Sequence, residues 1–420
     1  MARKMKDSGI EWIGEIPEGW EIKYFVQLFS QVKNKNIGLR EKNLLSLSYG
    51  KIKQKSIETV GGLLPDNFEG YNIIDRNDIV LRLTDLQNDQ HSLRVGLSPE
   101  RGIITSAYCS IRVRGAESPN YLYYYLHTFD IAKGFYGMGS GVRQGLSWDG
   151  LKYIKILLPP QHEQDRISVF LNQKTLEIDS ILSKTISSIE EYKKLKQTVI
   201  TQAVTKGVRG EREMKDSGVE WIGEIPVDWT IQRFARVAEV KSNLVSPDNY
   251  LEYPQISPEN IEKDSGKLLL PCKTVGEVGI ISGNHLFYKG QILYSKIRPK
   301  LNKVCIAPFD GLCSADMYPI ETNNDTRYIM YCILSNGFLQ QVSMITENRV
   351  KMPKVNQVEL SKILVAIPET IAEQTEIADY LDAKRAEIDG LIAKKDQLVK
   401  ELESYKKSLI YEVVTGKREV

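Results

Sequence analysis

The sequence predicts an α+β protein with a pseudo-two-fold internal repeat, in which each of two mixed α/β globular regions is followed by one long helix. The stretch MKDSGIEWIGEIP at residues 5–17 returns as MKDSGVEWIGEIP at residues 214–226. Extended to 5–25 and 214–234, the two copies share 15 of 21 residues at a constant offset of 209. Solenoid repeats span only ~20–50 residues, so this period indicates a duplicated domain. A glycine-poor apolar stripe of helical spacing follows each globular region.

The bulk properties are those of an ordinary globular protein. The chain has 420 residues, of which 42% are hydrophobic and 26% charged, and its net charge of +2 neither supports nor excludes nucleic acid. No apolar run is long enough for a transmembrane helix, and the start MARKMKDSGIEW has no apolar segment typical of a secretory signal. The cysteines are Cys109, Cys272, Cys305, Cys313 and Cys332. Their odd number and the lack of a CxxC pair favour reduced thiols in a cytoplasmic protein.

The first globular region reads as strands followed by one helix. Trp12 and Trp20 lie around a Gly/Pro-bearing turn, and we expect both to pack into a core. Residues 44–115 hold β-branched and apolar runs between turn signals, which is typical of strands. Residues 119–135 carry tyrosines and leucines at helical spacing behind a proline, so we expect a helix there. A Gly/Ser-rich loop at 137–150 then precedes a short strand stopped by a proline pair.

The segment 161–206 predicts one long amphipathic helix. Its apolar positions are Ile167, Leu171, Ile178, Ile181, Leu182, Ile189, Tyr192, Leu195, Val199 and Ala203. A stripe held for about 40 residues exceeds the usual helix length and favours coiled-coil pairing. Gly207 and Gly210 mark the end of the helix.

The second half repeats this order and ends in a second long helix, over 371–415. Its apolar positions are Ile377, Leu381, Ile388, Leu391, Ile392, Leu398, Leu402, Tyr405, Leu409 and Val413. The boundaries that we predict are 1–159 and 208–368 for the globular regions and 160–207 and 369–416 for the helices. The ends of the two halves are alike, whereas the middles keep the order of elements but little identity. This contrast suggests two binding surfaces with different specificities.

The sequence contains no recognisable catalytic constellation. The motifs GxxxxGK[ST], GxSxG, HExxH and [DN]PP[YF] are absent. The histidines His91, His127, His162 and His285 do not have metal-ligand spacing. The segment Asp382-Ala-Lys384 has the form of half a nuclease motif, but it lies on the second long helix without a second carboxylate. We therefore expect a non-catalytic protein with no metal site of its own.

Short basic clusters recur in both halves. Residues 101–114, 293–304 and 348–354 contain lysines or arginines and no acid, mixed with Asn, Gln, Ser or Thr. Lysine and arginine suit phosphates, arginine suits guanine edges, and Asn and Gln suit adenine edges. Each cluster alone is also compatible with a solvated charged surface. Their paired occurrence favours DNA binding.

Three motifs carry a resemblance to a known family. They are DSGxEWIGEIPxxW in both halves, the LPPxxEQ entry at Leu158–Gln164, and the helix ends EEYKKLKQTVITQAVTKG and ESYKKSLIYEVVTGK. In these motifs and in its two-fold repeat, the chain resembles the specificity subunit of type I restriction–modification systems, over essentially its whole length.

The resemblance implies a division of labour. Each globular region would be a target recognition domain that reads one half of a bipartite, asymmetric DNA sequence. The two long helices would pack as an antiparallel coiled coil and hold the domains apart. The subunit itself would be non-catalytic. It would bind two adenine-N6 methyltransferase subunits that use S-adenosylmethionine and, in the full complex, two restriction and translocation subunits that use ATP with magnesium.

The candidate DNA contacts lie in two stretches of each half. Arg82–Arg94 and Tyr294–Lys303 resemble recognition-domain stretches of the family, and the loops at Arg143–Lys152 and Asn348–Lys354 precede the final strand of each half. The expected contact residues are Arg82, Thr84, Gln87, Arg143, Gln144 and Ser147 in the first half, and Lys296, Arg298, Lys300, Asn348, Arg349 and Lys351 in the second.

The length of the two helices limits the distance between the half-sites of the DNA target. A helix of about 45 residues is roughly 65–70 Å long, which corresponds to at most about 20 base pairs of DNA.

Two other interpretations remain open at this point. One is a specificity subunit whose partner fuses methyltransferase and nuclease in one chain. The other is a coiled-coil scaffold that joins proteins without reading DNA sequence.

Overall fold

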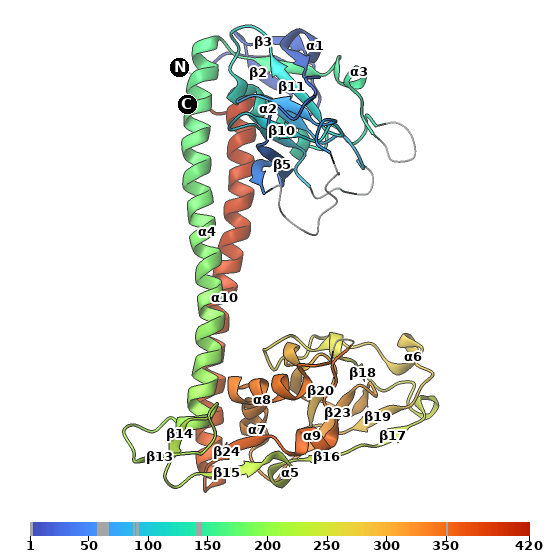
Figure 1. Ribbon diagram of the computed structural model, residues 1–420, viewed down its shortest axis with the longest axis vertical. Helices are drawn as coiled ribbons and strands as arrows, with labels where there is room; N and C mark the ends of the chain where they lie inside the picture. Colours follow the sequence, from blue (N-terminus) through green and yellow to red (C-terminus); the bar gives the residue numbers. More distant parts are fainter. Residues whose placement is uncertain (1–2, 57–66, 87–88, 90–91, 140–144, 350–351) are drawn as a thin grey trace. The chain divides into compact units, whose positions relative to one another are not determined.

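A computed structural model (Figure 1) describes residues 3–56, 67–86, 89, 92–139, 145–349 and 352–420. The chain divides into two compact units. Unit 1 comprises Met1–Thr185 and Gln397–Val420, and unit 2 comprises Ile186–Asp396. Each unit therefore contains one globular region together with a segment of each long helix.

The two long helices form where the apolar stripes predict them. They are α4 (Gln161–Lys206) and α10 (Ile371–Val414). Both end before a glycine in the left-handed conformation, Gly207 with φ +78° and Gly416 with φ +74°, where a side chain would be strained. Most stripe positions are covered, but Ile181, Leu195, Leu398 and Tyr405 are more than 40% exposed. The buried seam is thus narrower than the sequence stripe.

The globular region of unit 1 contains two four-stranded sheets. Its strands are β1 (Met5–Asp7), β2 (Glu15–Pro17), β3 (Glu21–Tyr24), β4 (Phe29–Gln31), β5 (Leu44–Ser48), β6 (Lys51–Lys55), β7 (Asn72–Ile74), β8 (Ile79–Leu81), β9 (Val95–Leu97), β10 (Gly102–Ile104), β11 (Cys109–Val113) and β12 (Lys155–Leu158). The sheet orders are β6-β5-β10-β7 and β4-β11-β8-β9, with two-stranded pairs β1-β2 and β12-β3. The expected strand-rich stretch is thereby confirmed.

Three helices complete this region: α1 (Phe25–Leu28), α2 (Pro119–Ile131) and α3 (Trp148–Leu151). The Ser118 hydroxyl caps α2 by accepting from the Tyr121 N–H, with Pro119 in the first turn. The predicted helix over 119–135 is too long at its end, because Lys133 takes a left-handed φ of 63°. The short helix α3 lies in the segment expected to be a loop.

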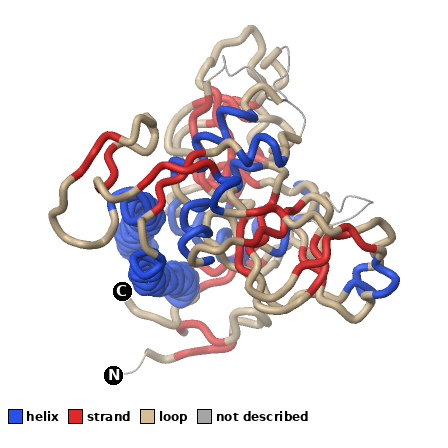
Figure 2. The backbone as a smooth tube through the Cα atoms, turned by 90° about the horizontal axis from the view of Figure 1, so that it is seen from below, coloured by secondary structure: helices blue, strands red, loops and turns tan. Residues whose placement is uncertain are grey.

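Unit 2 repeats the plan with other sequence. Its strands are β13 (Met214–Asp216), β14 (Glu224–Pro226), β15 (Thr230–Arg233), β16 (Glu239–Val240), β17 (Leu244–Val245), β18 (Gln255–Ile256), β19 (Asn284–Phe287), β20 (Ile292–Ser295), β21 (Val304–Ile306), β22 (Gly311–Cys313), β23 (Met317–Glu321) and β24 (Leu364–Ile367). The four-stranded sheets are β16-β23-β20-β21 and β17-β19-β22-β18. Figure 2 shows the strands and helices along the tube. In both units one parallel pair, β10-β5 or β22-β18, stands among antiparallel ones.

The helices of the second globular region are α5 (Phe234–Val237), α6 (Val275–Val278), α7 (Thr326–Leu334), α8 (Asn336–Thr346) and α9 (Gln357–Ser361), with 3-10 turns at Pro247–Asn249, Pro258–Asn260 and Pro299–Leu301. Helix α7 takes the place in unit 2 that α2 takes in unit 1, since Tyr328 and Tyr121 make equivalent contacts. Helix α8 has no counterpart among the predicted elements. It begins directly after α7 because the Ser335 hydroxyl accepts from the Phe338 N–H and caps it.

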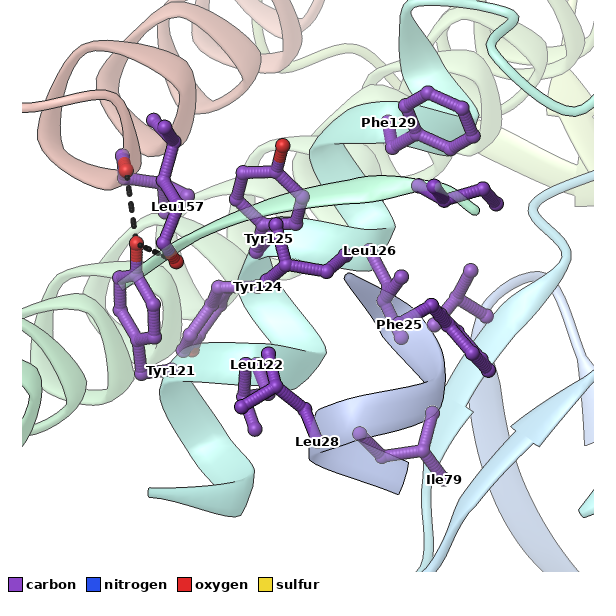
Figure 3. Close-up of a cluster of buried hydrophobic side chains, with 14 of the residues drawn as sticks. Phe25, Leu28, Ile79, Tyr121, Leu122, Tyr124, Tyr125, Leu126, Phe129 and Leu157 are labelled. Carbon is purple, nitrogen blue, oxygen red and sulfur yellow. Dashed lines mark hydrogen bonds between the residues drawn. The ribbon is translucent and has the colours of Figure 1, made fainter. Parts of the chain in front are cut away.

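Each unit has its own main core, at the junction between its globular region and its long-helix segments. In unit 1, side chains of α2, β12 and the sheet β4-β11-β8-β9 pack with Leu171 of α4 and Val413 of α10. Figure 3 shows part of this cluster. The buried Tyr121 hydroxyl donates to the carbonyls of Leu157 and Val414, at 3.1 and 3.3 Å. One side chain thus joins the last strand to the end of α10.

The repeated tryptophan segments lie against the first turn of a long helix. Trp20 and Trp229 are 1% and 0% exposed, which confirms that they pack into a core. Within unit 1 the Trp20 Nε1 donates to Glu163 of α4, and within unit 2 the Trp229 Nε1 donates to Glu373 of α10. Trp12 is half-buried against Tyr125, Phe129 and Tyr411.

Candidate nucleic-acid interface

The two candidate contact stretches of unit 1 meet at a backbone hydrogen bond. The segment after β8 carries Arg82 and Thr84, and the segment before α3 carries Ser147. The Leu146 N–H donates to the Leu83 carbonyl at 2.9 Å, so residues more than 60 positions apart become neighbours. Thr84 and Ser147 are both exposed beside this junction. The other predicted contacts of this half, Gln87, Arg143 and Gln144, lie outside the described residues.

The same arrangement recurs in unit 2. The segment after β20 pairs with the segment before α9, because the Val355 N–H donates to the Lys296 carbonyl at 2.9 Å and the Arg298 N–H donates to the Pro353 carbonyl at 2.8 Å. Lys296, Arg298 and Lys300 therefore stand beside this second junction. Asn348 is exposed just after α8. Lys351 lies outside the described residues.

A buried arginine builds the loop that follows β8. Arg94 is fully buried, and its guanidinium donates to the carbonyls of Arg82, Thr84 and Asp85 at 2.7–3.1 Å. It also stacks over the ring of Tyr136, 5.1 Å from the centroid. A charged side chain in the interior is retained only when its donors are satisfied, as they are here. Arg94 positions Thr84 rather than contacting a ligand itself.

Sequence reasoning did not single out Arg94. It lies at the end of the polar stretch Arg82–Arg94, where an arginine is most simply interpreted as a surface residue. Only the folded loop brings several carbonyls around one guanidinium.

The cationic side chains near the two junctions differ in whether they already have a partner within the protein. In unit 1, Arg82 pairs with Asp89 at 3.3 Å. In unit 2, Arg349 pairs with Glu359 and donates to the Lys354 carbonyl. The side chains of Arg298 and Lys300 are exposed and have no hydrogen bond or ion pair within the described part of the chain. These two are the cations best placed to meet an anionic ligand without breaking an existing pair.

Arg298 stands out for its backbone as well. Its φ of 45° is left-handed, which is uncommon for a residue with a side chain. The conformation is held by the hydrogen bond from its own N–H to Pro353 and by the bond from the Leu301 N–H to its carbonyl. The arginine is thereby presented outward at a tight turn.

A groove of about 770 Å³ lies beside the second junction. Its lining includes Lys296, His285, Tyr318, Gln357 and Ser242. The Lys296 ammonium lies 5.2 Å from the centre of the Tyr318 ring. The Gln357 amide donates to the Ser242 hydroxyl at 2.6 Å. Cation, amide and hydroxyl groups in one concave surface match the chemistry that reads phosphates and base edges.

His285 is a buried residue in the lining of this groove. Burial, together with the nearby Lys296 charge, lowers the pKa of its imidazole below the ordinary value. Its Nδ1 has no hydrogen-bond partner among the described residues. The groove therefore offers a neutral imidazole near the Lys296 ammonium at neutral pH.

Within the described residues, no three or more His, Cys, Asp or Glu side chains are grouped so that they could hold a metal ion. No helix of that part of the chain is long and apolar enough to cross a membrane.

Comparison with protein families finds a match in the second half of the chain. Residues 226–401 match the family model described as type I restriction modification DNA specificity domain. This range covers most of unit 2, including the junction of Lys296 with Val355 and the groove beside it.

Curated relatives extend the similarity. The chain is 34% identical to the type I restriction enzyme EcoDI specificity subunit of Escherichia coli, over 59% of this chain and 60% of that protein. It is 24% identical to the putative type I restriction enzyme MjaX specificity subunit of Methanocaldococcus jannaschii, over 96% of this chain and 95% of that one. The chain thus spans 60% of the length of the first relative and nearly all of the second.

Solved structures share the fold. A chain in a study of complex assembly and conformational transition of the type I R-M system aligns with a TM-score of 0.69 at 14% identity, over 96% of this chain and 99% of that chain. The HsdS subunit from Thermoanaerobacter tengcongensis aligns with a TM-score of 0.52 at 14% identity, over 96% and 98%. At this identity the likeness concerns the fold alone.

Proposed function

We propose, because this chain belongs to the specificity subunits of type I restriction enzymes, that each globular region reads one half of a bipartite, asymmetric DNA target. The observation that carries the proposal is one backbone junction that recurs in two regions of unlike sequence. It joins the segment after β8 to that before α3 in unit 1, and the segment after β20 to that before α9 in unit 2. A shared scaffold with different side chains suits two half-sites of different sequence.

The side chains suggest that some residues would hold the DNA backbone and others would read the base edges. Arg298 and Lys300 are exposed cations that would neutralise phosphates, a contribution that does not depend on sequence. Thr84 and Ser147 in unit 1, and Gln357 in the groove of unit 2, carry the hydroxyl and amide groups that can read base edges. The predicted contacts Gln87, Arg143, Gln144 and Lys351 belong to the same loops in the sequence.

The long helices would serve the assembly. We propose that α4 and α10 pair antiparallel, set the gap between the half-sites and dock two adenine-N6 methyltransferase subunits. Inside each unit, the helix segments run antiparallel. In unit 1 Asp179 meets Lys406 and Arg166 meets Val420. In unit 2 Lys196 meets Asp389, and Arg209, just after α4, meets Glu376. Two restriction and translocation subunits would complete the complex. S-adenosylmethionine, ATP and magnesium would be bound by those partners, and the complex would act in the cytoplasm.

Methylation mapping tests the proposal. The chain is expressed with its methyltransferase partner, and adenine methylation is read across a host genome with and without this chain. The expected result is methylation at one bipartite sequence, present only with the chain. Methylation at scattered, unrelated sites would contradict the proposed function.

Gel shifts separate DNA reading from a purely structural role. Binding is measured at physiological salt with a large excess of unrelated duplex as competitor. A specificity subunit retains its target under these conditions, because specific affinity exceeds non-specific affinity by about 10³-fold or more. A scaffold that only joins proteins would lose the DNA to the competitor. The names of the relatives favour the first outcome.

A further inference from the structure

Asp179, on the long helix α4 of unit 1, holds two lysines from different parts of the unit. Its carboxylate accepts from the Lys406 ammonium of α10 at 2.5 Å and from the Lys51 ammonium of β6 at 2.8 Å. Burial raises the pKa of this carboxyl, but the hydrogen bonds from Lys406 and Lys51 outweigh burial and leave the pKa below its ordinary value. The carboxylate is charged at neutral pH and ties both helices to the globular region.

Asp389 makes the corresponding arrangement in unit 2. Its carboxylate accepts from the Lys196 ammonium of α4 at 2.8 Å and pairs with the Lys267 ammonium of the globular region at 2.6 Å. Here too burial raises the pKa, and the hydrogen bonds from the two lysines outweigh it and lower the pKa overall. We call each aspartate with its two lysines a clamp.

The two clamps are only partly products of the duplication. Asp179 and Asp389 lie 210 positions apart, as do Lys196 and Lys406, so the helix members are repeated residues. Lys51 belongs to a strand of a hairpin, whereas Lys267 follows a turn closed by a hydrogen bond from the Glu262 N–H to its own carbonyl. Unlike sequences therefore supply a lysine to the same place in both globular regions.

Each clamp is one of two repeated polar contacts that flank the buried core between a globular region and its helix segments. The other is the glutamate that holds the buried tryptophan, Glu163 in unit 1 and Glu373 in unit 2. In both units the clamp aspartate follows its glutamate by 16 positions, which is about 24 Å along a helix. Leu171 and Ile178 in unit 1 pack into the core between these two contacts, as Ile377 and Leu381 do in unit 2. The clamp therefore ties the interface at the end away from the tryptophan, where it resists pivoting of the globular region.

The leverage is large compared with the DNA repeat. A shift of one base-pair step is about 3.4 Å, so a point about 24 Å from the pivot, the separation of the two contacts along the helix, moves by one step when the region pivots by about 8°. A small change in the seating of a globular region would therefore change which spacing of half-sites it can reach.

We propose that Asp179 and Asp389 are positioning residues that fix the angle of each globular region on its helix segments and thereby restrict the accepted gap between half-sites. This inference rests on the proposed function. The clamps are suited to the role because partly exposed ion pairs each contribute little to the stability of the fold. Losing one should loosen the angle without unfolding the protein. The clamp aspartates keep side-chain exposures of 29% and 20%.

The test uses the complex with its methyltransferase and duplexes whose spacer is natural, one base pair shorter or one longer. The readout is the ratio of methylation rates on the natural and the altered spacers. For Asp179→Ala and Asp389→Ala we expect this ratio to fall about tenfold, or about 1.4 kcal/mol of discrimination. Half-site sequence preference on the natural spacer should stay unchanged.

Matched variants isolate the clamp. Glu177→Ala removes an exposed carboxylate that pairs with Lys174 and accepts from the Gln173 amide, both on the same helix, and it should leave the ratio at the wild-type value. Asp179→Glu keeps the charge and should restore most of the discrimination. Lys51→Ala removes only the contact between Asp179 and the globular region, at a side chain that is 62% exposed. Its spacer ratio should fall as in Asp179→Ala, so the test stands even if Asp179→Ala folds poorly.

The outcomes are distinguishable. An unchanged spacer ratio in Lys51→Ala, Asp179→Ala and Asp389→Ala, with intact sequence-specific methylation, overturns the clamp and leaves the proposed function standing. Absence of sequence-specific methylation by the wild-type complex overturns the proposed function itself. A loss of half-site sequence preference equal to the loss of spacer discrimination would assign the aspartates to reading rather than positioning, and would also overturn the inference.

Discussion

The indole N–H of Trp20 donates a hydrogen bond of 3.0 Å to the carboxylate of Glu163, across 143 positions of sequence. Arg3 pairs with the same carboxylate at 2.6 Å and lies over the Trp20 ring. The second copy repeats the contact between Trp229 and Glu373 at 3.2 Å, with Arg212 in the place of Arg3. The repeated segment therefore forms a seat for the first turn of a long helix, which explains why it occurs twice.

Removing the acceptor of this seat should destabilise unit 1. Glu163→Ala leaves the Trp20 N–H without its acceptor and the Arg3 guanidinium unpaired, at a cost of about 2–3 kcal/mol. Urea denaturation at pH 7 measures the loss. Glu163→Gln retains an acceptor and should lose less than half as much, whereas Glu191→Ala on an exposed position of the same helix should be neutral. Equal losses in the alanine and glutamine variants would count against the seat.

The same carboxylate makes the seat sensitive to acid. Burial raises the pKa of Glu163, but hydrogen bonds from Arg3 and Trp20 outweigh burial and hold the pKa below its ordinary value. The stabilisation is present above the unfolded-state pKa of about 4.3 and is lost as pH falls through the lower folded-state pKa. Glu163→Gln should therefore have a shallower loss of stability below about pH 4.3.

Tyr121→Phe should cost about 1–2 kcal/mol, because a buried hydroxyl that donates to two carbonyls is removed. Thermal or urea unfolding measures the change. Tyr328 makes the equivalent contacts with the carbonyls of Ala366 and Val204, so Tyr328→Phe should lose a similar amount. Tyr153, which is 77% exposed, provides the control. A loss in Tyr153→Phe as large as in the buried variants would contradict the assignment.

His127 should make unit 1 less stable at mildly acidic pH. Burial, with the charges of Lys406 and Lys407, lowers the pKa of its imidazole to about 4. The unfolded chain protonates this residue below about pH 6.5, so between that pH and about 4 the unfolded state binds more protons. Stability should therefore fall as pH falls through this window, by about 3 kcal/mol in total.

His127→Leu isolates this effect. Leu334 already occupies the equivalent position in unit 2, six residues after Tyr328 as His127 is six residues after Tyr121. The difference in urea midpoint between pH 7 and pH 5 should shrink in the variant. His162→Leu, at an exposed position, should keep the wild-type difference. An unchanged pH dependence in His127→Leu would refute the prediction.

Arg298→Ala should weaken DNA binding through a phosphate contact. Its guanidinium is exposed and has no partner within the described residues, so no internal pair is lost with it. Affinity should fall for all sequences alike, and the slope of log affinity against log salt should decrease by about 1. Fluorescence anisotropy across a salt series measures both quantities. A loss confined to one target sequence would instead indicate base reading.

Arg349→Ala should weaken or relax recognition of the second half-site only, because this residue belongs to the globular region of unit 2. Its pair with Glu359 must open before it can meet DNA, so Glu359→Gln should act in the opposite direction and strengthen binding. Methylation of targets mutated in one half-site at a time provides the readout. Equal loss at both half-sites would argue against independent recognition by the two regions.

The sequence patterns predicted the helices and strands better than they predicted the contacts between them. The stripes predicted both long helices, because helical spacing of apolar residues is a local property. Helix α8 was missed because its start depends on the Ser335 cap. Ser335 can be recognised as a cap only once the end of α7 is known. Arg94 was missed because an arginine in a polar segment is buried only when a folded loop surrounds it with carbonyls.

Which distant segments meet became visible only in the folded chain. The contacts of Leu146 with Leu83, of Val355 with Lys296, and of each clamp aspartate with two lysines join residues tens or hundreds of positions apart. Such contacts depend on how sheets and helices pack, and no local pattern in the chain encodes them.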